Sequence, residues 1–158
     1  GSMGFTYGAN GIWQFNTDKE PLGTSVHGVS WGGESWKKAM DYPGSAQVGI
    51  GKKLLEKFEW WKFEPHAEWV EPEGGSDNIS GSFCAGIPGK ARIIYTPPVL
   101  EQRLKLVRGI ERGVQYSACF VNPSDGRVSK IGTVRADAKG DWPPPFTPSF
   151  RDWLLVIS

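Results

Sequence analysis

The spacing of apolar residues changes along the chain, and only one stretch near the start has helical spacing. Residues 46–61 form that stretch, and we predict a helix there with Ser45 as its N-cap and Pro65 ending the pattern. The apolar positions of this pattern are Val48, Ile50, Leu54, Leu55, Phe58 and Trp61. A second, shorter helix is predicted within "ESWKKAMDYPG", residues 34–44, where Pro43-Gly44 would end it.

The first residues show turn signals rather than a sustained period. Residues 4–15 predict a strand that opens into a glycine-punctuated loop, since β-forming residues alternate with glycines there. Residues 16–33 have no period and many turn residues, so we predict a long loop, which in compact domains is usually functional or disordered.

Beyond residue 78, short β-type stretches alternate with turn signals. Their spacing, without helices between them, predicts an antiparallel sandwich or barrel. "NPSDGR" at 122–127 predicts a hairpin turn, and the prolines of 141–150 exclude a central strand because proline lacks the donor. The predicted strands are 79–86, 91–96, 103–108, 114–121, 128–135 and 152–157.

These patterns predict mainly β structure with a helical N-terminal segment. Gly1-Ser2-Met3 is typical of the remnant of a cleaved expression tag and is left out. Residues 4–70 then form a strand, loop and helix segment, 71–78 a linker, and 79–158 an antiparallel β-sandwich. The first segment has too few elements to bury a core alone, so it must pack on the β-domain, on another chain, or on a missing part of the protein.

Composition narrows the function classes. The 18 Lys and Arg against 17 Asp and Glu, without long runs of one sign, disfavour nucleic acid and an anionic membrane as partners. No apolar stretch reaches the length of a membrane span. Cys84 and Cys119 lie in apolar strand-like contexts, so they are either two buried thiols or one disulfide. Because the sequence has no Cys/His cluster, we predict no metal site, and we predict no cofactor.

Tryptophan is unusually abundant, with eight residues in 158. Trp60, Trp61 and Trp69 are predicted to pack the helix against the sandwich, and Trp142 and Trp153 to lie in a core or interface. For Trp31 and Trp36 we favour a loop anchor and helix packing over ligand contact.

The order of several motifs resembles a known family. The chain contains "YGANGIWQF" at 7–15, the "NPSDG" turn and the closing "DWLLV" in this order. Through these motifs it resembles the C-terminal end of the apiosidase-like glycoside hydrolases. That family has a (β/α)8 barrel followed by a small β-sandwich whose catalogue name proposes collagen binding. The resemblance covers nearly the whole chain and implies a sandwich packed on a fragment of the barrel.

The resemblance also implies a substrate-binding segment. Residues 5–15 would be one of the last barrel strands with its loop, at the face where barrel enzymes build their sites, and 46–61 the last barrel helix. Tyr7, Asn10, Trp13 and Gln14 would then contact sugar by stacking and amide hydrogen bonds. The alternative is that Trp13 and Phe15 form one packed face of a strand.

We predict no catalytic residue in this chain. A (β/α)8 barrel needs roughly 200 residues, and in the resembled family the catalytic carboxylates lie upstream of the matching segment. Asp18, Glu20 and Glu34 are better explained as solvated loop charges or helix-start acids, and His27 and His66 have no triad pattern.

Three functions therefore stay open. The chain is expected to be the C-terminal part of a glycoside hydrolase acting on plant or microbial polysaccharide, inactive alone. It would alternatively be a carbohydrate- or collagen-binding module, for which sandwich aromatics are the candidates, or a bracing domain. Expected partners are carbohydrate and either the missing barrel or a second copy, and the resemblance suggests a secreted or extracytoplasmic location. The aromatic candidates are Tyr95, Tyr116, Phe120, Phe146, Phe150 and Trp153.

Overall fold

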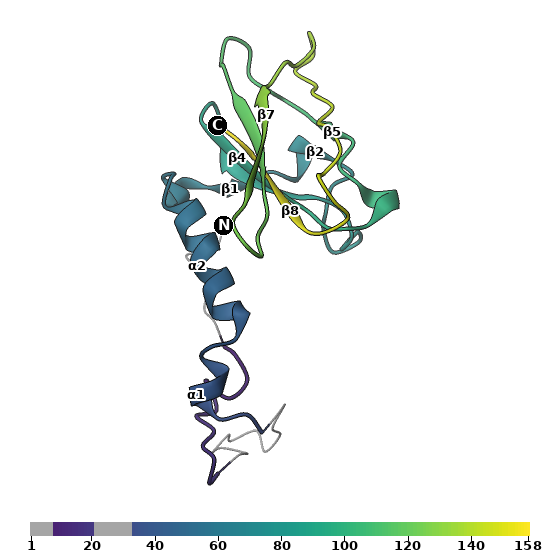
Figure 1. Cartoon of the computed structure of the whole chain (residues 1–158). Helices are drawn as coiled ribbons and strands as arrows, with labels where there is room; N and C mark the ends of the chain where they lie inside the picture. The colour runs from purple at the N-terminus through teal and green to yellow at the C-terminus, as the bar shows by residue number, and fades with distance from the viewer. Residues whose placement is uncertain (1–7, 21–32) are drawn as a thin grey trace. The chain divides into compact units, whose positions relative to one another are not determined.

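A computed structural model gives the fold and describes residues 8–20 and 33–158 (Figure 1). Tyr7, His27 and Trp31 lie outside these residues. Leu54–Ser158 form one compact unit, and the described residues up to Lys53 belong to another. The helices are α1 (Trp36–Ala39) and α2 (Pro43–Leu55), with short 3-10 turns η1 (Trp60–Lys62), η2 (Ala67–Trp69) and η3 (Leu100–Gln102).

Most of the β-rich unit is one antiparallel sheet. Its strand order is β1-β3-β4-β8-β6-β7, and β2 and β5 form a separate two-stranded sheet (Figure 1). The predicted class, mainly β with a helical N-terminal segment, is confirmed. The strands are β1 (Glu64–Pro65), β2 (Val70–Glu71), β3 (Phe83–Ile87), β4 (Ala91–Thr96), β5 (Leu106–Val107), β6 (Ser117–Val121), β7 (Val128–Thr133) and β8 (Trp153–Ile157).

The main core covers one face of the large sheet. Alternate residues of β4, β6 and β8 point to it, among them Ile94, Phe120 and Leu155, as the two-residue period of strands requires. Val70 of β2 and Val107 of β5 belong to the same cluster. The small sheet and its flanking loops therefore form the second layer, which is a reduced version of the predicted sandwich.

The opposite face carries a smaller cluster. Val121 and Val156 are buried there against Leu54, near the end of α2, with Phe58 packed beside them. The amphipathic pattern of 46–61 correctly located these two apolar contacts, although Phe58 lies in the turn after the helix.

The N-terminal helices differ from their predicted limits. Pro43 begins α2 instead of ending the preceding helix, as suits a residue with fixed φ and no N–H at a first helical position. Ser45 is thus inside the helix, and its Oγ donates to the carbonyl oxygens of Met40 and Tyr42. The helix ends at Leu55, so the prediction of 46–61 was wrong at both ends.

Three tryptophans near the end of this segment behave differently from one another. Trp69 is buried in the main core, as are Trp142 and Trp153. Trp61, by contrast, is 65% exposed on η1, so the prediction that it packs against the sandwich is wrong. Trp60 is half-buried.

The predicted β4 limits agree with the structure, and the other five predicted strands are shorter than expected or begin later. Sequence reasoning missed β1 and β2, which have two residues each. Residues 143–150 form no strand, in agreement with their proline content. Glu71, at the start of the predicted linker, lies in β2 and pairs with Leu106.

Both cysteines are free thiols. Cys84 contributes to the main core and Cys119 packs with the cluster on the opposite face of the sheet. The two side chains are therefore separated by the sheet itself, and the alternative of one disulfide is wrong.

Candidate functional site

The segment 8–16 forms a compact turn where a strand was expected. The amides of Ile12 and Trp13 both donate to the carbonyl of Ala9, and the amide of Asn16 donates to the carbonyl of Gly11. Phe15 has a φ of 55°, which side-chain-bearing residues rarely adopt. Neither the expected strand character nor its alternative, a packed strand face, is present in residues 8–15.

The turn is attached to the start of α1. The amide of Trp36 donates to the carbonyl of Asn16 at 2.8 Å, and the rings of Phe15 and Trp36 stack with centroids 5.4 Å apart. Trp36 thus packs at a helix start, in agreement with its predicted structural role.

The predicted sugar-binding residues of this turn differ in exposure. Trp13 is 46% exposed and Asn10 is exposed, whereas Gln14 is only 3% exposed. The Oε1 atom of Gln14 accepts a hydrogen bond from the amide of Gly11 at 2.8 Å, which closes the turn. Trp13 and Asn10 thus form the accessible surface, while Tyr7 lies outside the described residues.

The carboxylates Asp18, Glu20 and Glu34 lie between the turn and α1 along the chain. Asp18 and Glu20 are exposed, and Glu20 closes a small turn through its amide, which donates to the Thr17 hydroxyl oxygen. Glu34 pairs with Lys38 at 2.7 Å, and the hydrogen bond to Glu34 raises the pKa of Lys38. These contacts agree with the reading of Glu34 as a helix-start charge.

In residues 8–20 and 33–158, no group of three or more His, Cys, Asp or Glu side chains could hold a metal ion. None of the helices in that part of the chain is long and apolar enough to cross a bilayer.

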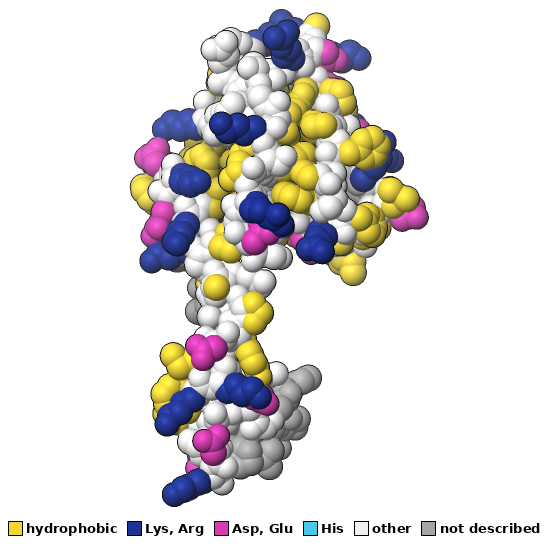
Figure 2. Space-filling view, in the orientation of Figure 1, with side chains coloured by type: hydrophobic (Ala, Val, Ile, Leu, Met, Phe, Trp, Pro, Cys, Tyr) yellow, Lys and Arg dark blue, Asp and Glu magenta, His cyan; other side chains and the backbone are white. Residues whose placement is uncertain are grey.

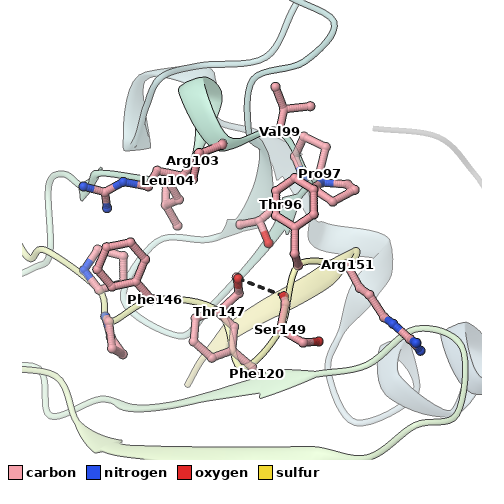
Figure 3. A pocket seen from close by; sticks show the side chains of 15 residues that line it. Thr96, Pro97, Val99, Arg103, Leu104, Phe120, Phe146, Thr147, Ser149 and Arg151 are labelled. Carbon is pink, nitrogen blue, oxygen red and sulfur yellow. Dashed lines mark hydrogen bonds between the residues drawn. The ribbon is translucent and has the colours of Figure 1, made fainter.

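A separate pocket of about 220 Å³ lies in the β-rich unit (Figure 3). The chain enters it after β4 at 96–104 and again before β8 at 144–151, and Phe120 of β6 also lines it. Phe146 and Phe150 on its wall are 73% and 70% exposed. The guanidinium carbon of Arg103 lies 4.5 Å from the centroid of the Phe146 ring, a cation–π contact.

The six sandwich aromatics named from the sequence divide by burial. Tyr116, Phe120 and Trp153 are core residues, as period-2 alternation allows, and Phe146 and Phe150 come from an irregular segment. Tyr95 is 36% exposed and donates to Asp152 at 2.5 Å. Within the described residues, these six aromatics do not form a line of exposed rings on one sheet face. The sequence analysis missed Arg103 because its ring partner, Phe146, is 43 residues away.

Comparison with known protein families finds a match over the first part of the chain. The family model described as "Apiosidase-like, catalytic domain" matches residues 1–62, which include the turn, α1 and α2. This first part of the chain is therefore similar to part of an apiosidase-like catalytic domain. The family resemblance predicted from motif order is thereby confirmed, although nothing here bears on the collagen-binding name of the second domain.

Two solved structures have a similar fold. One is described as a glycoside hydrolase, with a TM-score of 0.68 and 20% identity over 99% of this chain and 33% of that chain. The other is a glycoside hydrolase of family 5 from Bacteroides vulgatus, with a TM-score of 0.64 and 18% identity over 94% of this chain and 30% of that one. A search of curated proteins found no match.

The chain spans about one third of the length of the glycoside hydrolase structures that it matches. At these identities the likeness concerns the fold. The assignment of residues 4–70 to a barrel and of 79–158 to an accessory domain stays a prediction.

Proposed function

We propose that this chain is the C-terminal portion of a glycoside hydrolase that acts on plant or microbial polysaccharide, and that it is inactive alone. The observation that carries the proposal is the family match. The model of a catalytic domain matches only residues 1–62 of this chain, which is too short a stretch for a whole barrel. A retaining glycosidase needs two carboxyl groups roughly 5–5.5 Å apart. In this proposal, parts of the enzyme outside the chain supply that pair.

The role of the turn would be to contact substrate. Trp13 offers an exposed indole against which the C–H face of a sugar ring can stack, and Asn10, three residues earlier, offers an exposed amide. Gln14 would act by holding the turn through its bond to Gly11. Tyr7 is retained in this proposal on the family resemblance alone.

A hydrolysis assay tests the catalytic part of this proposal. The purified chain, at high concentration, is incubated with aryl glycosides and plant polysaccharides, and released sugar is measured. We expect no turnover. Turnover that disappears in Glu20→Gln or Glu34→Gln would overturn the proposal, because a complete site would then lie within this chain.

A second candidate function is carbohydrate binding without catalysis. The exposed Phe146 and Phe150 beside a pocket favour it, since exposed aromatic rings are suited to stacking on sugars. Collagen binding has no comparable side-chain support, and a purely bracing role for the β-rich unit predicts no ligand at all. Electrophoresis of the chain through gels that contain polysaccharide separates these alternatives.

A further inference from the structure

The pocket described above continues into two neighbouring hollows. Pro145 and Phe146 line the pocket and one hollow, whereas Ser149 and Arg151 line the pocket and the other. Pro148 lines both hollows. Because the segment 143–151 borders all three, we call this continuous depression the 143–151 groove.

The walls of the 143–151 groove are apolar and unusually exposed. Phe146, Phe150 and Leu100 are 73%, 70% and 64% exposed, and several prolines lie between them. Figure 2 shows hydrophobic side chains between Lys and Arg side chains on the visible face of the β-rich unit. Exposed apolar surface of this kind marks ligand or partner sites.

All charged residues that line the groove are basic, namely Arg103, Arg127, Lys130 and Arg151. The overall charge of the chain is only +1, so this local excess does not follow from composition. Arg127 is neutralised by Asp125 at 2.8 Å. The other three form no ion pair with any acidic side chain in the described ranges 8–20 and 33–158, although the charge of Arg151 contributes to the lowered pKa of Asp125.

The basic groups are distributed along the groove. In Figure 3 Arg103 and Arg151 lie on opposite sides of the pocket, and the head of Arg151 points away from its centre. Arg151 also lines the adjoining hollow with Ser129 and Trp153. A ligand that contacts both arginines must therefore extend beyond one ring.

We propose that the 143–151 groove binds an acidic polysaccharide that contains uronate units. This inference rests on the carbohydrate-binding role proposed above and adds the substrate class. The C–H faces of sugar rings would cover Phe146 and Phe150, and their carboxylates would pair with Arg103 and Arg151. A planar guanidinium matches a carboxylate through two parallel hydrogen bonds.

Two other polyanions suit the groove less well. Single-stranded nucleic acid also uses aromatic and basic grooves, but its affinity depends on many phosphate contacts, and only three unpaired cations are available here. Binding of a sulfated polymer would depend on its charge density alone and would not need the exposed aromatic rings. The apolar walls and the few, separated arginines together favour a polymer with one charge per ring.

Affinity electrophoresis of the full chain through gels that contain polygalacturonate or alginate tests this proposal. We expect clear retardation of the wild type, about a tenfold weaker affinity for Phe146→Ala, and a several-fold loss for Arg103→Gln and for Arg151→Gln. Phe83→Ala and Arg135→Gln are matched controls, because both residues are exposed and line none of the three hollows. Near-UV circular dichroism verifies that each variant is folded.

The remaining outcomes overturn the proposal in distinguishable ways. Equal retardation by neutral xylan would remove the uronate requirement and leave carbohydrate binding intact. Equal or stronger retention by dextran sulfate or oligodeoxythymidylate would reveal binding to any polyanion. No retardation in any gel would reject both the groove and the binding-module function, while the hydrolysis assay still decides on the catalytic proposal.

Discussion

Arg92 is a fully buried charge whose terminal guanidinium nitrogens find partners, whereas its Nε atom has none among the described residues. Its guanidinium donates to the carbonyl oxygens of Arg108 and Gly109 and pairs with Glu111 at 2.9 Å. It also lies 3.8 Å from the centroid of the Trp69 ring. A buried cation is tolerated only when it is paired and hydrogen-bonded, so Glu111 matters more for stability than a surface carboxylate would.

The ionisation of Glu111 predicts a stability difference that depends on pH. Burial raises the pKa of Glu111, but hydrogen bonds from the Tyr116 hydroxyl and the Gly89 amide, with the charge of Arg92, outweigh burial and lower it. A lowered folded-state pKa stabilises the protein above the ordinary value of about 4.3, and this contribution disappears as pH falls through the folded-state pKa. Glu111→Gln should therefore reduce the free energy of unfolding by about 2–3 kcal/mol at pH 7.

Urea unfolding followed by tryptophan fluorescence at pH 7 and pH 3 measures this effect. The gap between Glu111→Gln and wild type should shrink at the lower pH. The control is Glu101→Gln, since Glu101 is exposed on η3 and should change stability little at either pH. A gap that stays constant from pH 7 to pH 3 would mean that the carboxylate charge is not its source.

At the scale of elements, the turn 8–16 depends on one glycine. Gly11 has a φ of 85°, and a Cβ atom there would lie 2.6 Å from the carbonyl oxygen of Glu34 and 2.9 Å from Cβ of Ala39. Gly11→Ala should therefore separate the turn from α1, at a cost of about 1–3 kcal/mol for the strained backbone alone.

Amide hydrogen exchange of Asn16 and Trp36 reports on this prediction, because both amides donate within the turn and its attachment. Exchange should accelerate in Gly11→Ala. Gly8→Ala is the matched control, since a Cβ atom at Gly8 meets nothing within 4 Å. Unchanged exchange in Gly11→Ala would contradict the role given to Gly11.

The same elements show what sequence patterns could and could not predict. Alternation located β4, β6 and β8 because each buries one face, and Leu54 and Phe58 were recognised by helical spacing. The turn was missed because it is fixed by contacts such as Gly11 with Glu34, 23 residues apart. The 143–151 groove was missed for the same reason, since its lining comes from segments that sequence spacing does not connect.

For the whole molecule, the exposed apolar side chains predict that the chain associates with itself. Trp61 is 65% exposed, and the cross-strand pair Phe83 and Tyr95 is 41% and 36% exposed. Under the proposed function, other parts of the enzyme would cover such residues. For the chain by itself, we propose a second copy as the partner, because exposed apolar patches favour association.

Sedimentation equilibrium across a range of protein concentrations tests this self-association. We expect a weak dimer with a dissociation constant on the order of 0.1 mM, which is typical of a small and imperfect interface. Trp61→Lys should shift the equilibrium to monomer, because a strongly hydrated ammonium group opposes burial of the site where the indole lay. Val128→Lys is the matched control, since Val128 is 54% exposed on β7 and should leave the equilibrium unchanged. A monomer at every concentration would show that these apolar side chains are tolerated in water. Carbohydrate and the rest of the barrel would then be the predicted partners that remain.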